Sequence, residues 1–200
     1  MRRRDFLLDA AIASAIVAAS PLGPAIVSEK AGDCGCGISA VLYDERHADC
    51  QMFADSFMRR GALKLATNGD AGGLWYGRLR QHLMRFPGSV AGMTTDSDWG
   101  VSRGCGREAG FTVAYEGSHD FRMTGAIAHS LRGCGAEKDV YTEIWSEPNA
   151  WADSIANALS RHRTMEPTAS GVRSPLITTL RTGDRLGYLT SWLLRPSQLA

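Results

Sequence analysis

Apolar residues between positions 38 and 115 follow two alternating patterns. Short, mostly apolar runs of four to six residues predict strands that are buried on both faces. Between these runs the apolar residues recur at helical spacing, as Met52, Phe53 and Phe57 do. The predicted strands cover residues 38–43, 63–66, 89–93 and 111–115. The predicted helices cover residues 49–60, 74–86 and 99–109.

The repeated strand–helix order predicts an α/β domain. Short connections and helical crossovers favour parallel neighbouring strands joined by right-handed crossovers. We therefore expect three layers, with helices on both faces of a mostly parallel sheet, similar to Rossmann and flavodoxin-like folds. This single α/β domain is expected to cover residues 38–200 and to follow a Gly/Cys-rich linker at residues 29–37.

The last third of the chain has a different pattern. Residues 123–132 are expected to be helical, and so is the stretch from Pro148 to residue 161, because proline is favoured at the first position of a helix. Residues 140–145 are expected to form a strand. Residues 176–180 and 186–194 flank a polar turn, which predicts a β-hairpin that adds an antiparallel edge to the sheet. The tryptophans expected in the core of this part are Trp145, Trp151 and Trp192.

Polar residues follow each of the four predicted strands. In an open α/β sheet, ligands bind beyond the carboxyl ends of the strands, where helix N-termini offer backbone N–H groups. We therefore expect one ligand-binding rim built from residues 44–46, 68–73, 94–98 and 118–120. The ligand-binding candidates at this rim are Asp44, Arg46, Asn68, Asp70, Gly72, Trp75, Thr94, Thr95 and Asp120.

Structural roles compete with ligand binding at several of these positions. Asp70 is suited to cap the helix that follows it, and Ser97 or Asp98 is suited to cap the next one. Trp75 suits either the floor of an apolar ligand pocket or packing between a helix and the sheet. Both interpretations stay open at this point.

The candidates for acid–base catalysis are His119 and Asp96. Imidazole titrates near neutral pH, and His119 follows the fourth predicted strand. A purely structural or exposed role for this histidine is the competing interpretation. The sequence has neither a Gly-x-Ser-x-Gly nucleophile elbow nor a His-Glu-x-x-His metal-binding helix.

The N-terminus carries an arginine pair ahead of an apolar stretch. Arg3 and Arg4 precede Asp5-Phe6-Leu7, and an Ala-rich run covers residues 10–19. This order resembles the twin-arginine (Tat) signal peptide, in which the pair is followed by a variable residue, Phe and Leu. The resemblance implies a signal peptide over residues 1–28, the Tat translocase as a partner during export, and a periplasmic location.

The length of the apolar run and the overall charge limit the classes of partner that are expected. The run is shorter than the ~20 residues that a spanning helix needs, so we expect no stable membrane span after processing, although an uncleaved anchor is the alternative. Removing residues 1–28 takes away three arginines and two aspartates, which leaves 19 basic and 19 acidic side chains. This neutral balance excludes the basic excess that is typical of nucleic-acid binding.

Five cysteines are present, so disulfides cannot pair them all. Cys34 and Cys36 flank a single glycine, and Cys50, Cys105 and Cys134 are dispersed. An oxidising compartment favours bridges. Cys34 and Cys36 are therefore candidates for a structural bridge, for inert thiols, or for a redox pair or soft-metal site. No motif identifies a cofactor.

Three classes of function fit these features. The first is an exported periplasmic protein that binds a small ligand or assists an exported redox enzyme, since catalytic motifs are missing. The second is a small α/β hydrolase or lyase that uses His119 and Asp96 at the strand ends. The third is a thiol or metal protein based on Cys34 and Cys36.

Overall fold

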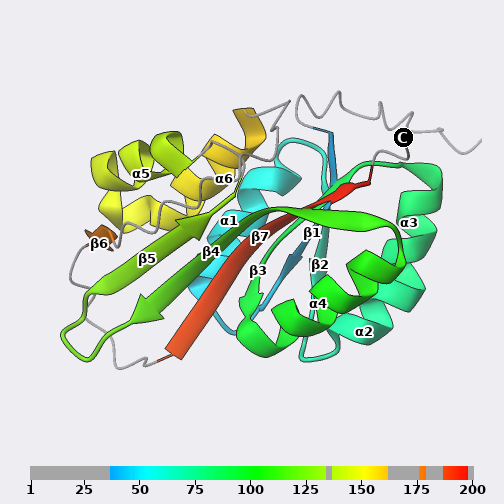
Figure 1. Cartoon of the computed structure of the whole chain (residues 1–200), viewed down its shortest axis with the longest axis horizontal. Helices are drawn as coiled ribbons and strands as arrows, with labels where there is room; N and C mark the ends of the chain where they lie inside the picture. Colours follow the sequence, from blue (N-terminus) through cyan, green and yellow to red (C-terminus); the bar gives the residue numbers. More distant parts are fainter. Residues whose placement is uncertain (1–36, 134–136, 162–175, 179–186, 198–200) are drawn as a thin grey trace, which may run out of the picture.

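The computed structural model describes residues 37–133, 137–161, 176–178 and 187–197, and Figure 1 shows their arrangement. The strands are β1 (Ile38–Tyr43), β2 (Leu63–Ala66), β3 (Ser89–Thr95), β4 (Phe111–Phe121), β5 (Ile127–Arg132), β6 (Leu176–Thr178) and β7 (Gly187–Pro196). The helices are α1 (Ala48–Met58), α2 (Ala71–Leu74), α3 (Arg80–Arg85), α4 (Asp96–Glu108), α5 (Glu137–Ser146) and α6 (Trp151–Arg161). A π-helical turn at Trp75–Leu79 joins α2 to α3, and a 3-10 turn at Pro148–Ala150 leads into α6.

The α/β class is confirmed, but the expectation of a mostly parallel sheet is wrong. The strands form one sheet in the order β2-β1-β3-β7-β4-β5-β6. Only the pairings of β1 with β2 and with β3 are parallel. The pairings β3–β7, β7–β4, β4–β5 and β5–β6 are antiparallel. The sheet is therefore mixed, because the regular strand–helix alternation ends with β4.

The expected C-terminal hairpin is also wrong. β7 lies between β3 and β4 in the middle of the sheet, whereas β6 pairs with β5 at the far edge. β7 is buried on both faces: Leu189 and Leu193 belong to one apolar core, and Trp192 and Leu194 belong to the other. A central strand has this two-sided apolar pattern, whereas an edge strand usually does not.

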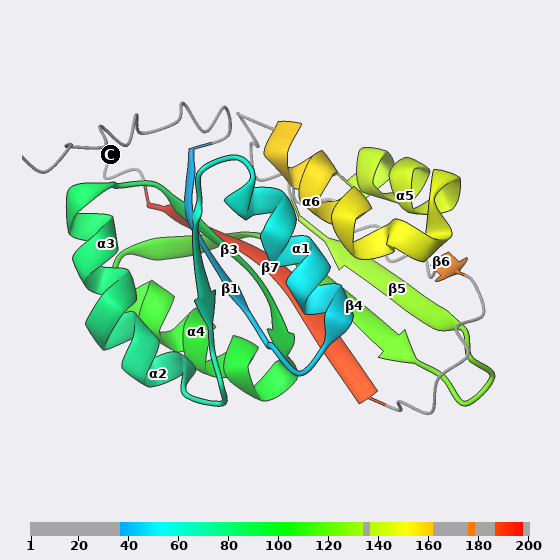
Figure 2. The same cartoon turned by 180° about the vertical axis from the view of Figure 1, so that it is seen from behind.

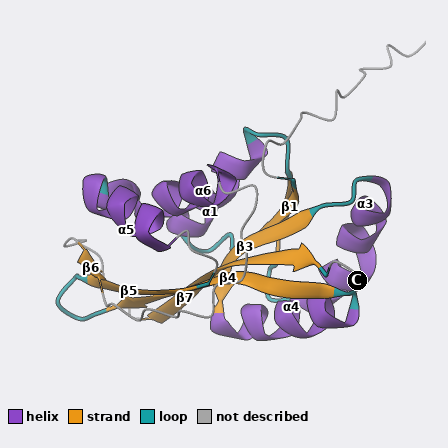
Figure 3. Ribbon diagram, turned by 45° about the horizontal axis from the view of Figure 1, so that its top comes forward, coloured by secondary structure: helices purple, strands orange, loops and turns teal. Residues whose placement is uncertain are grey.

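Helices cover both faces of the sheet, as Figure 3 shows. α1, α5 and α6 pack on one face, where Phe53, Phe57 and Trp151 fill the core. α2, α3 and α4 pack on the other, where Trp75 and Trp99 meet the sheet. Figure 2 shows α1 and α6 side by side over the centre of the sheet. None of the helices in the described part of the chain has the length and apolar character that crossing a bilayer requires.

Three further expectations fail between residues 115 and 146. β4 continues past Tyr115 to Phe121, and the predicted helix 123–132 is largely β5. In β5 buried and exposed side chains alternate from His129 to Arg132, which is the period of a strand. The predicted strand 140–145 lies in α5, where Val140 and Ile144 are buried one helical turn apart.

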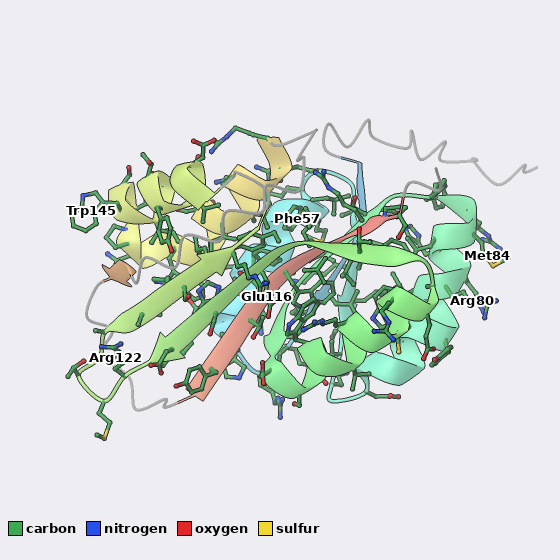
Figure 4. All side chains as sticks on the ribbon, viewed as in Figure 1. Phe57, Arg80, Met84, Glu116, Arg122 and Trp145 are labelled. Atoms are coloured by element: carbon green, nitrogen blue, oxygen red, sulfur yellow. The ribbon has the colours of Figure 1, made fainter. Side chains whose placement is uncertain are left out.

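The three C-terminal tryptophans do not share one environment. Trp151 and Trp192 are buried, as expected. Trp145 is 71% exposed, and Figure 4 shows its side chain pointing away from the body of the protein at the end of α5. Trp145 follows Ile144 directly, so the helix that buries Ile144 turns Trp145 outward. The expected helix start at Pro148 is confirmed as the 3-10 turn that leads into α6.

Candidate functional site

The ends of four strands meet at one edge of the sheet. β1, β2 and β3 are parallel, so their carboxyl ends lie together. β7 is antiparallel to both β3 and β4, which means that β3 and β4 run in the same direction. Leu189 of β7 pairs with Thr95 on one side and with His119 on the other. We call the segments at the ends of β1, β2 and β3, residues 44–47, 67–70 and 95–98, the rim; the last of these is the end of β3 and the first turn of α4.

The rim contains the point at which the chain reverses its winding. After β1 the chain enters α1 on one face of the sheet, and after the neighbouring β3 it enters α4 on the other face. Loops that leave in opposite directions open a crevice between two strand ends, and open α/β sheets bind ligands there. The sequence-based expectation of a rim thus applies to β1, β2 and β3 despite the mixed sheet.

Asp44 and Arg46 form the best-defined polar contact at the rim. The Arg46 side chain donates to Asp44 from Nε to Oδ1 at 2.9 Å and from Nη2 to Oδ2 at 2.6 Å. The backbone N–H of Arg46 also donates to Oδ1, at 3.0 Å. The Asp44 side chain is 1% exposed and that of Arg46 is 64% exposed. A buried carboxylate therefore fixes the orientation of a guanidinium that reaches solvent.

This geometry sets the ionisation of both groups. The hydrogen bond from the Arg46 side chain lowers the pKa of Asp44, and burial of the carboxyl opposes that shift without overcoming it. The same bond raises the pKa of Arg46 above its ordinary value, and the charge of Asp98 adds to it. Asp98 thus lies within electrostatic reach of Arg46. Both groups therefore stay charged near neutral pH, so Arg46 is a permanent hydrogen-bond donor at the rim.

A second buried contact connects the other two loops. Thr67 Oγ1, just after β2, donates to Asp98 Oδ2 at 2.7 Å in the first turn of α4, and both side chains are buried. The backbone N–H of Thr67 donates to the carbonyl of Tyr43, and that of Asp44 donates to the carbonyl of Met93. The three strand ends are therefore held in one rigid unit. Asp98 was expected only as a helix cap, and its bond to Thr67 could not be read from residues 31 positions apart.

The loop after β2 is a turn and helix cap. Asn68 and Gly69 both have positive φ, and Asp70 Oδ1 accepts the backbone N–H of Gly73 at 2.8 Å. A Cβ at Gly73 would overlap the Asp70 carboxylate, so the cap requires glycine there. Gly72 lies in α2 against Val101. The capping interpretation of Asp70 is thus confirmed, and any ligand role must use this loop's exposed surface.

Two predicted ligand-binding residues are packed in the core instead. Trp75 is 4% exposed and meets Phe111 edge to face at 5.9 Å, so it contributes to helix–sheet packing rather than to a pocket floor. Thr94 is buried, and its Oγ1 accepts the indole N–H of Trp192 at 3.2 Å. Thr95 lies at the start of α4 with its hydroxyl 3.1 Å from that of Ser97, on the exposed side of the rim. Asp96 beside them is exposed.

His119 is enclosed within the protein, not presented by a loop. Because β4 extends to Phe121, His119 is a strand residue with no exposed surface, between the sheet and α6. Asp96 is exposed at the start of α4, so the structure does not bring these two catalytic candidates together. Asp120 points to the opposite side of β4 and lies 3.6 Å from Arg122.

The contacts of His119 instead form a buried series of hydrogen-bonded side chains. Its Nε2 lies 2.8 Å from Ser191 Oγ, and its Nδ1 lies 2.8 Å from His129 Nδ1. The Tyr115 hydroxyl lies 3.2 Å from Ser191 Oγ. A serine, an imidazole and an orienting group also form the core of many hydrolase sites. Here Ser191 and both histidines are fully buried, so substrate does not reach them in this conformation.

Burial lowers the pKa values of both histidines in this hydrogen-bonded series. Desolvation is the largest cause that lowers the pKa of His119, and the neighbouring His129 adds to it. Burial lowers the pKa of His129 to about 4. Both rings are therefore neutral at pH 7. Neither Ser191 nor His129 was among the predicted site residues, since these partners lie on strands 72 and 10 positions away from His119.

Metal and thiol chemistry gain no support from the described residues. Within that part of the chain no group of three or more His, Cys, Asp or Glu side chains is placed to hold a metal ion. Cys50 is buried, and burial raises the pKa of its thiol, which makes it unreactive. Cys105 is half-buried and also unbridged. Cys34 and Cys36 lie outside the described residues, so their predicted roles stay predictions.

Comparison with known proteins gives no assignment. No family model, no curated protein and no solved structure matches this chain. Function is therefore argued from the rim and from the leader.

Proposed function

We propose that this protein binds a small polar ligand at the rim, with Arg46 as the principal ligand-binding group. The observation that carries the proposal is the Asp44–Arg46 pair at the carboxyl end of β1, beside the point where the chain changes faces between β1 and β3. A buried carboxylate anchors a largely exposed guanidinium at the place where open α/β sheets bind ligands. Holding an arginine in one orientation lowers the entropy lost when it binds, because fewer rotamers are lost.

The surrounding groups indicate the chemistry of the ligand. Arg46 favours a carboxylate or another oxygen acceptor. The exposed Asp96 carboxylate and the Thr95 and Ser97 hydroxyls offer acceptors for ligand N–H or O–H groups. A small molecule with an acidic group and a nearby donor, such as an amino acid or a sugar acid, satisfies both requirements.

Replacing Arg46 with Gln is expected to remove this binding. In a thermal-shift screen of amino acids, dicarboxylates and sugar acids, a ligand at 100 times its Kd should stabilise the wild type by about 2.7 kcal/mol. That corresponds to about 5–10 °C in Tm for a chain of this size. The Arg46→Gln variant should lose most of this shift, since a charge-assisted bond is removed.

The matched control is Arg80→Gln. Arg80 is exposed on α3, far from the rim, and Figure 4 shows its side chain directed to solvent. This variant should keep the full ligand-induced shift. Each shift is measured against the variant's own ligand-free Tm, because Arg46→Gln leaves Asp44 buried without its guanidinium. Equal stabilisation of Arg46→Gln and wild type would refute the role of Arg46.

We also infer that the protein is exported through the Tat pathway and acts in the periplasm. The support is the leader, Arg3-Arg4-Asp5-Phe6-Leu7 followed by the apolar run at 10–19. An exported redox enzyme as a partner rests on the same resemblance and stays a prediction.

Changing both Arg3 and Arg4 to Lys is expected to stop export, because the arginine pair is the defining feature of this signal. Fractionation of cells that produce the full chain should find the variant in the cytoplasm and the wild type in the periplasm. Arg2→Lys, which leaves the pair intact, is the control and should be exported normally. Periplasmic recovery of the double variant at the wild-type level would contradict the assignment.

A further inference from the structure

A pair of histidines meets edge to face inside the core, directly beneath one helix. His119 of β4 and His129 of β5 are cross-strand partners in register. Trp151, the first residue of α6, covers both rings, with centroid distances of 4.6 Å to His119 and 5.0 Å to His129. Both histidines are fully buried.

The hydrogen bond between the two Nδ1 atoms requires at least one neutral ring. Only one of the two Nδ1 atoms, 2.8 Å apart, carries a proton, so one ring donates and the other accepts. A first added proton places a charge in an apolar core between the sheet and Trp151. A second places two N–H groups against each other and breaks the Nδ1–Nδ1 bond. Protonation therefore opposes closure of α6 over the pair.

The polar groups around the pair lie on the strands and on the neighbouring helices. On the strands, His119 Nε2 contacts the hydroxyl of Ser191, which in turn contacts the hydroxyl of Tyr115. On α6, Asp153 pairs with Ser56 and Arg59 of α1, and Arg161 pairs with Glu143 of α5. These pairs fasten α6 to its neighbouring helices rather than to the histidines. The remaining ionisable groups whose side chains the structure describes here are Asp49, Cys50 and Asp55 on α1, Arg60 just after α1, Asp139 and Tyr141 on α5, and Glu147 just after α5.

We propose that the His119–His129 pair is an acid-sensitive latch that holds α6 on the sheet at neutral pH and releases it on acidification. Release exposes Trp151 and the inner face of β4 and β5. The pair in the closed state has lowered pKa values, so the open state binds more protons below about pH 6.5. Closure is thus fully stable above that pH and weakens as the pH falls toward 4.

The size of the effect follows from proton linkage. At pH 4.5 an open-state histidine with a pKa of about 6.5 favours opening by about 100-fold, and two such groups favour it by about 10⁴-fold. The α6 opening equilibrium should therefore rise by about 100- to 10⁴-fold between pH 7 and pH 4.5. The half of the sheet formed by β1, β2 and β3 has no such pair among its described residues and should stay closed.

Pulsed hydrogen exchange with mass spectrometry tests the latch on the full chain, with pulses scaled to the intrinsic exchange rate at each pH. The expected result is loss of protection in α6 and β5 at pH 4.5, while β1 and α4 stay protected. The double variant His119→Gln/His129→Gln, which cannot take up a proton there, should show α6 protection that does not depend on pH. His82→Gln, at a half-buried histidine of α3 that is bonded to Ser39, should keep the wild-type response.

Three outcomes would overturn the proposal. They are simultaneous opening of α6 and β1 at one pH, an unchanged acid response in the double variant, and full α6 protection down to pH 4.5. If the double variant does not fold, a proton NMR titration of the wild-type histidines tests the latch instead. Two rings that do not titrate until α6 opens support the latch, and two rings that titrate near pH 6.5 in the closed state refute it.

Discussion

Replacing Trp192 with Ala is expected to lower the free energy of unfolding by about 3–5 kcal/mol. Trp192 has no exposed surface and lies in the middle of β7, paired with Gly92 of β3 and Glu116 of β4. Its ring stacks on Trp99 at 5.2 Å, and its indole N–H donates to Thr94. The substitution removes a large apolar surface and leaves a cavity between α4 and the sheet. It also leaves the buried Thr94 hydroxyl without the indole N–H that it accepts.

Trp145→Ala is the matched control for this result. The same amino acid is removed, but Trp145 is 71% exposed at the end of α5. Its loss should change stability by no more than about 0.5 kcal/mol. Urea unfolding followed by circular dichroism measures both variants. Similar losses at the two positions would mean that β7 is not the central strand.

Gly92→Ala is expected to destabilise the protein by about 1–3 kcal/mol, although alanine is usually the better residue within regular structure. Gly92 lies in β3, and a Cβ there would overlap the ring of Trp192. The Trp192 ring cannot move away easily, because it stacks on Trp99 and its indole N–H is bonded to Thr94. The added methyl therefore strains the strand pair or displaces the ring.

Gly100→Ala provides a control of opposite sign. Gly100 lies inside α4, where a Cβ would meet nothing within 4 Å. Alanine should stabilise the helix by about 0.5–1 kcal/mol there. Chemical denaturation of the two variants should thus give shifts in opposite directions. Stabilisation by Gly92→Ala would show that β3 and β7 do not pack as described.

The local part of the fold was predictable from the sequence. β1, α1, β2, β3 and α4 lie close to their expected positions, because apolar runs and helical periodicity are local signals. The place of β7 was not predictable, since pairing with β3 joins residues about a hundred positions apart. Its apolar run favours a strand that is buried on both faces, but the sequence does not tell which strands lie beside it. The exposure of Trp145 was misjudged because its segment was assigned to a strand rather than to a helix.

The same distinction applies to the candidate site. Asp44 and Arg46 could be found from the sequence, because both lie in one loop after a buried strand and bond to each other over two residues. The contacts between Thr67 and Asp98 and between His119, His129 and Ser191 depend on tertiary structure. Catalysis by His119 with Asp96 was inferred from the titration range of imidazole and from the place of both residues after predicted strands, and it did not anticipate the extension of β4 that buries His119.

Ligand binding at the carboxyl ends of β1, β2 and β3 can be located residue by residue by NMR. Backbone amide shifts are followed while the ¹⁵N-labelled protein is titrated with the amino acids, dicarboxylates and sugar acids of the thermal-shift screen. We expect saturable shifts to concentrate on residues 44–48, 67–70 and 94–98. Saturable shifts that concentrate elsewhere, or a screen that gives none, would contradict it.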